Sequence, residues 1–321
     1  MGISIFTRNN NKIMVWKKIF NLRILILTTI VFLNAVSCTN MSSSNGASNK
    51  IYFRPEIGSV FEFELNEQQE VGQSDRITNG EWKTFLANNI TFSYKLENKG
   101  PGNRFRVSVR FMGYKRRYKV LGKDSIEDSR IGHFQGGLKA FNDAVFVVDI
   151  EPSGKVSIFS GNEDFESKFG RSDDKNPLEK NRKDLIFFPK EYFAELIGKI
   201  STILPDTGVS VGDSWTRKQS PNLNEPVNTI ITYRITEIKG GIAYIKTSSA
   251  TEKELMPQST IGQNTTMLMK GLGEGNILLD ANTGMLIESE NSINITGTNV
   301  ISGINVKINT NYKTDIKGKR V

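Results

Sequence analysis

The sequence predicts a mainly β protein, in which a large antiparallel curved sheet or half-barrel is built from two similar β units with one amphipathic helix between them. Three observations lead to this prediction. Apolar and polar residues alternate with a period of two through most of the chain, as at Phe61, Phe63 and Leu65. One segment shows helical spacing instead. Short motifs also recur in the same order in the two halves, which suggests an internal duplication.

The N-terminal segment has the composition of a secretory signal. Basic residues (Lys17, Lys18, Arg23) precede the apolar run Ile24–Leu33, and small residues then lead to Cys38, the single cysteine of the chain. This arrangement resembles a bacterial lipoprotein signal, which implies cleavage before Cys38 and acylation of that residue, with palmitate among the acyl chains. An incidental cysteine and a transmembrane anchor are the alternatives, but a span needs about 20 apolar residues.

The sequence therefore predicts a lipid-anchored protein of the cell envelope. Residues 1–37 are expected to form the signal peptide, with translation starting at Met1 or Met14. Residues 38–50 are rich in Ser, Asn and Gly and are expected to form a flexible tether. The expected location is the outer membrane, either on its periplasmic face or at the cell surface.

Charge and composition exclude several classes of function. Residues 1–37 hold five basic and no acidic residues, so the rest of the chain carries 37 basic against 34 acidic residues, a net charge of +3. This near balance argues against a nucleic-acid partner. A Cys–His or Ser–His catalytic pair would have to use His133, the single histidine, to which we assign no catalytic role. We expect no enzyme activity, no metal and no cofactor.

The first β unit is expected at residues 51–160. Its clearest strand alternates between apolar and polar residues from Phe105 to Phe111. Compared with the second unit, it is expected to carry longer loops at residues 72–88 and 122–142.

A strongly basic stretch lies within this first unit. Between Lys95 and Lys123 there are ten basic residues and one acid, Glu97. We expect a basic stripe that crosses adjacent strands and binds anionic lipid head groups or an acidic glycan. The alternative is a solvated sheet face that is balanced by acids on neighbouring strands, such as Glu62 and Glu64. The candidate residues of the stripe are Arg106, Arg110, Lys115, Arg116, Arg117 and Lys119.

The connector at residues 161–204 begins as a polar segment and ends as a helix. Its paired acids Asp173 and Asp174 have no apolar surroundings that would raise a pKa, so we interpret them as solvated charges rather than glycosidase carboxylates. After Pro189 the apolar residues fall at helical spacing, which predicts an amphipathic helix from Pro189 to Ile203.

The second β unit is expected at residues 205–321. Asp280–Gly284 begins like a calcium loop but lacks the later ligands, so it is predicted to be a hairpin turn with Gly284 at positive φ. Gly271, Gly273 and Gly275 do not have the spacing of a phosphate-binding loop. They are predicted to mark a bulge or a close backbone approach.

One segment of the second unit resembles a known family. Leu204–Trp215 follows the pattern L-P-x-x-x-V-x-V-G-D-x-W, and a second motif runs through Gly273-Glu-Gly275, Leu279-Asp280 and Thr283-Gly284. Both are similar to motifs of an uncharacterised family of bacterial envelope lipoproteins. The resemblance implies no activity, because the function of that family is unassigned, and Trp215 is expected to be a core anchor.

Two classes of function remain. The first is a binding module, in which a concave sheet wall and the helix hold a lipid or other amphiphile. The second is a structural or interaction lipoprotein that docks on an anionic envelope component through the basic stripe. A cavity between sheet and helix would favour the first, and a filled core with an exposed stripe would favour the second. The oligomeric state is left open. The wall residues are Phe105, Val107, Val109 and Phe111.

Overall fold

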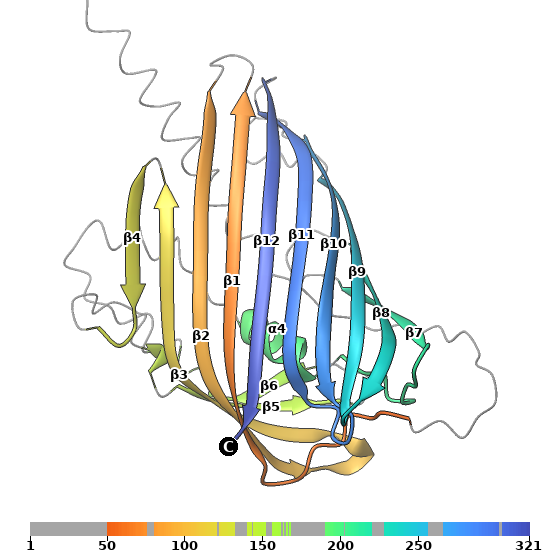
Figure 1. The fold of residues 1–321 in the computed structure, drawn as a ribbon. Coiled ribbons are helices and arrows are strands. Elements are labelled where there is room, and N and C mark those ends of the chain that lie inside the picture. Colours follow the sequence, from red (N-terminus) through yellow and green to blue (C-terminus); the bar gives the residue numbers. More distant parts are fainter. Residues whose placement is uncertain are drawn as a thin grey trace, which may run out of the picture.

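In the computed structural model, the described residues form one open antiparallel sheet of twelve strands, with the helix α4 on one of its faces (Figure 1). This confirms the predicted fold class. The described residues are 50–75, 80–120, 122–131, 140–142, 144–151, 156–161, 163, 165, 167, 190–201, 203–219, 228–255, 266–301 and 304–321. The elements are β1 (Val60–Asp75), β2 (Glu81–Lys99), a short 3₁₀ turn (Pro101–Asn103), β3 (Phe105–Val120), β4 (Lys123–Asp128), β5 (Val145–Ile150), β6 (Val156–Ser160), α4 (Lys190–Ser201), β7 (Ser214–Gln219), β8 (Asn228–Lys239), β9 (Ile242–Leu255), β10 (Thr266–Asp280), β11 (Leu286–Ile301) and β12 (Ile304–Arg320).

The first and the last strand of the sheet lie side by side in its middle. The strand order is β6-β5-β3-β2-β1-β12-β11-β10-β9-β8-β7, and β4 pairs with the C-terminal part of β3. The first strands thus run outward to one edge, the connector carries the chain to the other edge, and the last strands run back until β12 pairs with β1. The two predicted units therefore form one continuous sheet.

Two pairs of the recurring motifs occupy corresponding places in the two halves, and these are Gly58–Phe61 with Gly212–Trp215 and Ile90–Tyr94 with Ile230–Tyr233. Gly58 precedes β1 and Gly212 precedes β7, and both glycines have positive φ, 83° and 91°. The second pair of motifs lies in β2 and β8, the next strand of each half. A duplication with boundaries at 51–160 and 205–321 stays a prediction.

The first expected long loop, at residues 72–88, is largely strand, so that part of the prediction is wrong. Strand β1 extends to Asp75 and β2 starts at Glu81, with Gly72 paired to Lys83. Strand β4 occupies part of the second expected loop. Apolar residues in these segments, such as Phe85 and Leu86, do not alternate with polar ones, so there was no period of two to detect, but the backbone ladder continues regardless of side-chain type.

The helix packs on one face of the sheet, which we call the inner face, and appears behind the strands in Figure 1. It runs from Lys190 to Ser201, within the predicted range. Its Phe193 lies among Phe111, Phe146 and Phe165, with ring centroids 5.5, 4.5 and 4.9 Å away. The four wall residues proposed from the sequence are buried in this aromatic core, so they do not line an open cavity.

Several predicted features lie outside the described residues. These are the signal peptide, Cys38 and nearly all of the tether, together with His133, Asp173 and Asp174. In the described ranges, no helix combines the length and apolar character that a membrane span requires. The lipid anchor therefore stays a prediction.

Candidate functional site

The strand register arranges the inner face in rows, and one of these rows is polar. Glu67 on β1 pairs with Asn88 on one side and with Thr314 on the other. The neighbouring row towards the aromatic core contains Leu65 and is mostly apolar. Polar side chains on a buried face need hydrogen-bonding partners, which makes this row the part of the sheet least explained by folding alone. From β2 to β8 the row reads Asn88, Glu67, Thr314, Asn291, Gly275, Thr247 and Tyr233.

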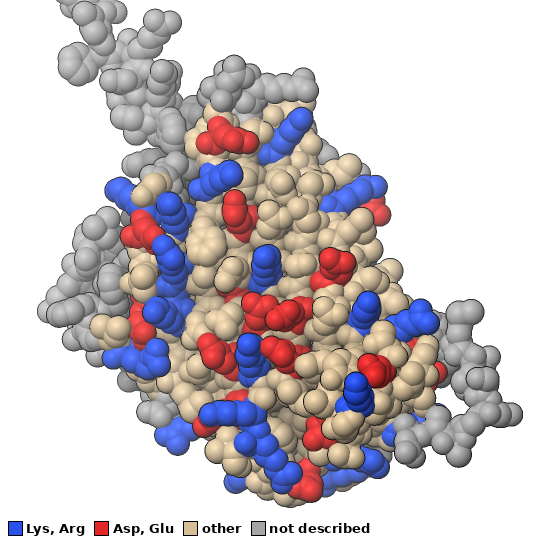
Figure 2. All heavy atoms as spheres, in the orientation of Figure 1, with Lys and Arg blue, Asp and Glu red and all other residues tan. Residues whose placement is uncertain are grey.

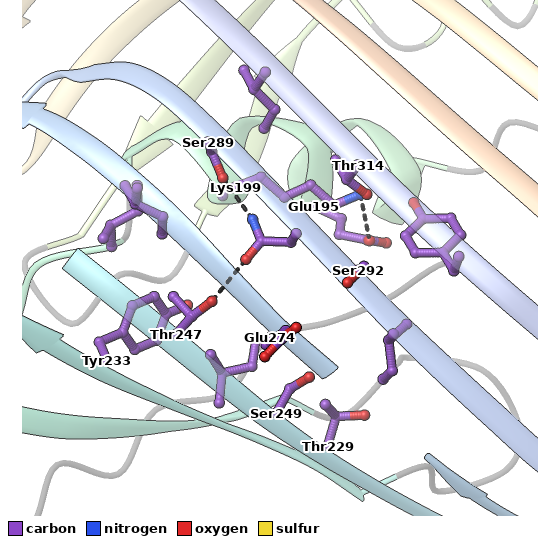
Figure 3. A pocket seen from close by; sticks show the side chains of 18 residues that line it. Glu195, Lys199, Thr229, Tyr233, Thr247, Ser249, Glu274, Ser289, Ser292 and Thr314 are labelled. Atoms are coloured by element: carbon purple, nitrogen blue, oxygen red, sulfur yellow. Dashed lines mark hydrogen bonds and ion pairs between the residues drawn. The ribbon is translucent and has the colours of Figure 1, made fainter. Parts of the chain in front are cut away.

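A cavity of about 140 Å³ lies between this polar row and the helix (Figure 3). Glu195 and Lys199 of α4 line one side of the cavity, and strands β8 to β12 line the other. Thr247 and Ser249 are among the polar residues on the sheet side. Isoleucines complete the lining, so the cavity has both polar and apolar walls. The isoleucines are Ile203, Ile231, Ile277, Ile293 and Ile316.

A buried charge cluster marks the end of the cavity at β1 and β12. Lys199 Nζ lies 2.7 Å from Glu67 Oε1 and 3.6 Å from Glu195 Oε1. The Tyr312 hydroxyl donates to the same Glu67 oxygen at 2.8 Å. Glu67 and Glu195 are each 7% exposed. The cluster joins the helix to the two central strands, which are far from α4 in the sequence.

The pKa values in this cluster follow from burial and pairing. Burial acts most strongly on Glu67 and would raise its pKa, but the Lys199 charge and hydrogen bonds from Lys199, Tyr312 and Asn88 outweigh it, so the pKa is lowered. Burial likewise opposes the charged form of Lys199, yet Glu67, Tyr312 and Glu195 raise its pKa well above the usual value. Both groups of the Glu67–Lys199 pair are therefore charged at neutral pH.

Three glycines of β10 form part of the sheet wall behind the cavity. By strand alternation, Gly271, Gly273 and Gly275 all face inward. A Cβ at Gly275 would lie 2.1 Å from Asn291 Oδ1, and one at Gly273 would lie 2.4 Å from Ser249 Oγ. The prediction of a close approach is confirmed, but the register shift in β10 lies at Leu278/Leu279 instead.

The space above Gly275 is used by a hydrogen-bond chain. Thr247 Oγ1 donates to Asn291 Oδ1 at 2.9 Å, and Asn291 Nδ2 donates to Ser289 Oγ at 2.6 Å (Figure 3). Thr247 and Asn291 flank Gly275 on the two neighbouring strands, so their bond crosses the glycine. This chain fixes the side chains of the cavity wall.

We expect Gly275→Ala to destabilise the protein by about 1–3 kcal/mol, because the added methyl group must displace Asn291 and break the chain of hydrogen bonds. Urea unfolding would measure the change. Gly72→Ala is the matched control in a strand, since the nearest atom to its Cβ position is 3.7 Å away. Equal stabilities for the two variants would contradict the role assigned to Gly275.

The basic stripe differs from the prediction in its geometry. All six residues lie on the single strand β3, whereas the sequence predicted a stripe that crosses adjacent strands. A register shift at Thr91/Phe92 leaves Met112 as an extra residue of β3. Alternation therefore changes phase there, which puts Lys115 on the outer face with Arg110 and turns Arg116 to the inner face beside Tyr118.

Acidic partners on neighbouring strands neutralise part of the stripe. Arg106 makes two hydrogen bonds to Asp149 at 2.8 and 3.0 Å, and Arg117 makes two to Asp124 at 3.1 and 2.6 Å. These acids differ from those expected, because Glu62 pairs with Lys319. Figure 2 still shows a column of basic side chains over β3 on the outer face, with acids beside it.

The sequence analysis missed Glu67, Glu195, Lys199 and Tyr312. One signal was present, since Glu67 continues the inward positions of Phe61, Phe63 and Leu65 and so places a carboxylate on the buried face. The predictions for other positions are confirmed. Gly284 has a φ of 70° in the turn after β10, and Trp215 is 4% exposed, with its Nε1 donating to the Ile203 carbonyl at 2.9 Å.

Similar solved structures are distant. A chain of the structure "Lipid-protein interactions in lipovitellin" has a TM-score of 0.41 and 8% identity, and the alignment covers 81% of this chain but 25% of that one. An outer membrane channel from Pseudomonas putida F1 has a TM-score of 0.25 and 5% identity, and the alignment covers 87% of this chain and 100% of that one. OccK7 (OpdD) from Pseudomonas aeruginosa has a TM-score of 0.24 and 6% identity, and the alignment covers 82% of this chain and 100% of that one. These similarities are too low to support an argument about function.

Sequence comparison gives a clearer result. No curated protein matches the sequence. A family model described as a family of unknown function, DUF6263, matches residues 103–286, which is more than half of the chain and extends from the turn before β3 to the start of β11. The chain therefore belongs to the DUF6263 family of unknown function.

Proposed function

We propose that this protein is a lipid-anchored, non-catalytic protein of the bacterial cell envelope that binds a lipid or other amphiphile. The observation that carries the proposal is the cavity between α4 and the sheet, because it combines a row of hydroxyl and amide side chains with isoleucines. A mixed lining of this kind suits a molecule with a polar and an apolar part. The lipoprotein-like signal ending at Cys38 supplies the anchor and the location.

The size of the cavity limits what it encloses. A cavity of about 150 Å³ in another protein holds one benzene molecule, and the cavity here measures about 140 Å³. It therefore encloses one part of an amphiphile, and the remainder extends beyond it. Within the described residues, the aromatic core around Phe193 is filled by side chains.

The cavity chemistry supports binding rather than catalysis. Glu67 and Lys199 form an ion pair with an N–O distance of 2.7 Å, so both charged groups are already paired with each other. A general acid or base needs a pKa close to the working pH, whereas pairing lowers the pKa of Glu67 and raises that of Lys199. The pair is better suited to holding the helix on the sheet.

Native mass spectrometry with lipid extraction tests the proposal. The protein would be expressed from Thr39 onward behind an ordinary secretory signal, a form that keeps every described strand and the helix, and purified without detergent from its own envelope. We expect a stoichiometric adduct that organic solvent releases as an amphiphile. A clean apo mass, together with no binding of added amphiphiles, would contradict the proposal.

The alternative is an interaction protein that docks on an anionic envelope component through β3. The basic column on the outer face favours it (Figure 2). Its usable part is smaller than expected, because Arg106 and Arg117 are paired with acids and Arg116 lies on the inner face.

We expect charge reversal of Arg110, Lys115 and Lys119 to Glu to lower partitioning onto phosphatidylglycerol vesicles by about a hundredfold, since each basic residue near an anionic surface contributes about 1 kcal/mol. Vesicle cosedimentation at constant salt would measure the change. Reversal of Arg234, Lys239 and Lys246, three basic residues of β8 and β9, is the matched control. Unchanged retention of the β3 variant would remove the alternative.

A further inference from the structure

We infer that the cavity takes the small, uncharged, hydroxylated head of an amphiphile, a glycerol-like polyol, and leaves the acyl chain outside. This inference rests on the proposed function and adds the chemical class of the bound group. It starts from the polar side chains that the second half of the sheet presents to the helix.

Folding alone does not require these polar side chains. In the neighbouring row of the inner face, Leu65, Ile90 and Ile245 are almost fully buried and pack into the core. The inward residues at the cavity carry hydroxyl and amide groups instead, although burying such groups costs free energy unless they find partners. A polar ligand accounts for this difference between the two rows. The polar lining residues on the inner face are Thr229, Thr247, Ser249, Ser289, Asn291 and Thr314.

These side chains leave hydrogen-bonding capacity for a ligand. Thr247, Asn291 and Ser289 bond to one another in a chain, and each hydroxyl in it can still accept a further bond. Among the described residues, the hydroxyl of Ser249 has no hydrogen-bonding partner, and its Oγ lies over Gly273 at the cavity wall. A ligand hydroxyl both donates and accepts, so it can pair with Ser249 and with this chain.

The charges at the helix wall select a neutral group. Glu195 and Lys199 both line the cavity, with Lys199 Nζ 3.6 Å from Glu195 Oε1 (Figure 3). A carboxylate or phosphate head would meet the negative charge of Glu195, and an ammonium head would meet the positive charge of Lys199. Enclosing either charge would also cost its hydration. An uncharged hydroxyl group can accept from the ammonium and donate to the carboxylate.

The volume also fits a polyol head. Glycerol has six non-hydrogen atoms, as many as the benzene that a cavity of about 150 Å³ holds. The isoleucines around the polar row, among them Ile231 and Ile293, can contact the carbon atoms of such a group. A chain of twelve carbons would exceed the 140 Å³ available.

Calorimetric titration of the protein from Thr39 onward with three amphiphiles of one chain length tests this inference. The ligands are monododecanoylglycerol, dodecanoate and dodecylammonium, each below its micellar concentration, with free glycerol as a fourth. We expect monododecanoylglycerol to bind at least tenfold more tightly than the two charged amphiphiles and free glycerol to bind far more weakly.

Two variants identify the site. Ser249→Ala and Thr247→Val each remove one hydroxyl, and each is expected to weaken monododecanoylglycerol binding about three- to tenfold, with little effect on the charged amphiphiles. Ser249→Ala is the safer variant for folding, because no described hydrogen bond is lost. Thr232→Val on the other face of β8 is the matched control and is expected to change nothing.

The outcomes separate the inference from the proposed function. Equal binding of the three amphiphiles, unaffected by the two variants, would overturn the polyol inference and leave amphiphile binding intact. Free glycerol binding as tightly as monododecanoylglycerol would keep the polyol chemistry but overturn the amphiphile function. No binding by any of the four would overturn both.

Discussion

Replacing Lys199 by Met is expected to destabilise the protein by about 3 kcal/mol or more at neutral pH. The substitution keeps most of the unbranched apolar side chain but removes the ammonium that lies 2.7 Å from Glu67 Oε1. Two carboxylates that are each 7% exposed would then lose their shared cation. Breaking a buried ion pair by removing one partner typically costs 3–5 kcal/mol, because an uncompensated charge stays buried.

The loss should shrink in acid, and this distinguishes an electrostatic cause from a packing defect. In the wild type the pKa of Glu67 is lower in the folded protein than its value of 4.5 in the unfolded chain. The charged carboxylate therefore stabilises the fold above pH 4.5, and this stabilisation is lost as the pH falls through the folded pKa. Without Lys199, burial raises that pKa, so the variant gains stability when Glu67 takes up a proton. Urea unfolding at pH 7 and pH 4 would measure both effects.

Lys313→Met is the matched control for this prediction. Lys313 follows Tyr312 on β12, lies on the outer face and is exposed. Its replacement should change the free energy of unfolding by less than about 0.5 kcal/mol. A destabilisation by Lys199→Met that stays the same from pH 7 to pH 4 would contradict the electrostatic account.

Replacing Phe193 by Ala is expected to cost about 3–5 kcal/mol and to loosen the helix from the sheet. Phe193 is 1% exposed, stacks on Phe146 at 4.5 Å and contacts the rings of Phe111 and Phe165. Truncating a buried phenylalanine removes its transfer free energy and leaves a void in a closely packed core. Urea unfolding would give the change in stability, and hydrogen exchange would show whether the amides of α4 lose protection.

A partly exposed phenylalanine provides the comparison. Phe85 lies on β2 with intermediate exposure, and alternation places it on the outer face. Its replacement by Ala should cost about 1 kcal/mol or less. If Phe193→Ala cost no more than Phe85→Ala, the aromatic cluster would not be what holds α4 on the sheet.

The fold class and the helix could be predicted because each depends on a local pattern. Alternation at Phe61, Phe63 and Leu65 specifies a strand with one buried face, and the apolar spacing after Pro189 specifies an amphipathic helix. Neither pattern contains the strand register, which depends on contacts between distant segments. Joining the halves by pairing β1 with β12 was therefore beyond what the sequence showed.

The candidate site was harder to predict for the same reason. Glu67 and Lys199 are separated by 132 positions in the sequence and meet because the connector places α4 across the central strands. The bulge at Met112 moves Arg116 from the outer to the inner face of the sheet. No residue pattern in this part of the sequence indicates that bulge. The sequence pattern places Glu67 on a buried face, but it does not identify Lys199 as the partner.

The pairing of the first and last strands has a consequence for biogenesis. Strand β1 is made first but finds one of its two neighbours in β12, the last strand to be made, and Val321 N donates to Val60 O at 3.0 Å at the end of this ladder. The middle of the sheet thus cannot close until β12 has been synthesised. Until then β1 and β11 each carry an unpaired backbone edge, which is a known hazard for aggregation. A chaperone that shields those edges until β12 is available would therefore be expected to raise the yield of folded protein more than one that acts on the completed chain.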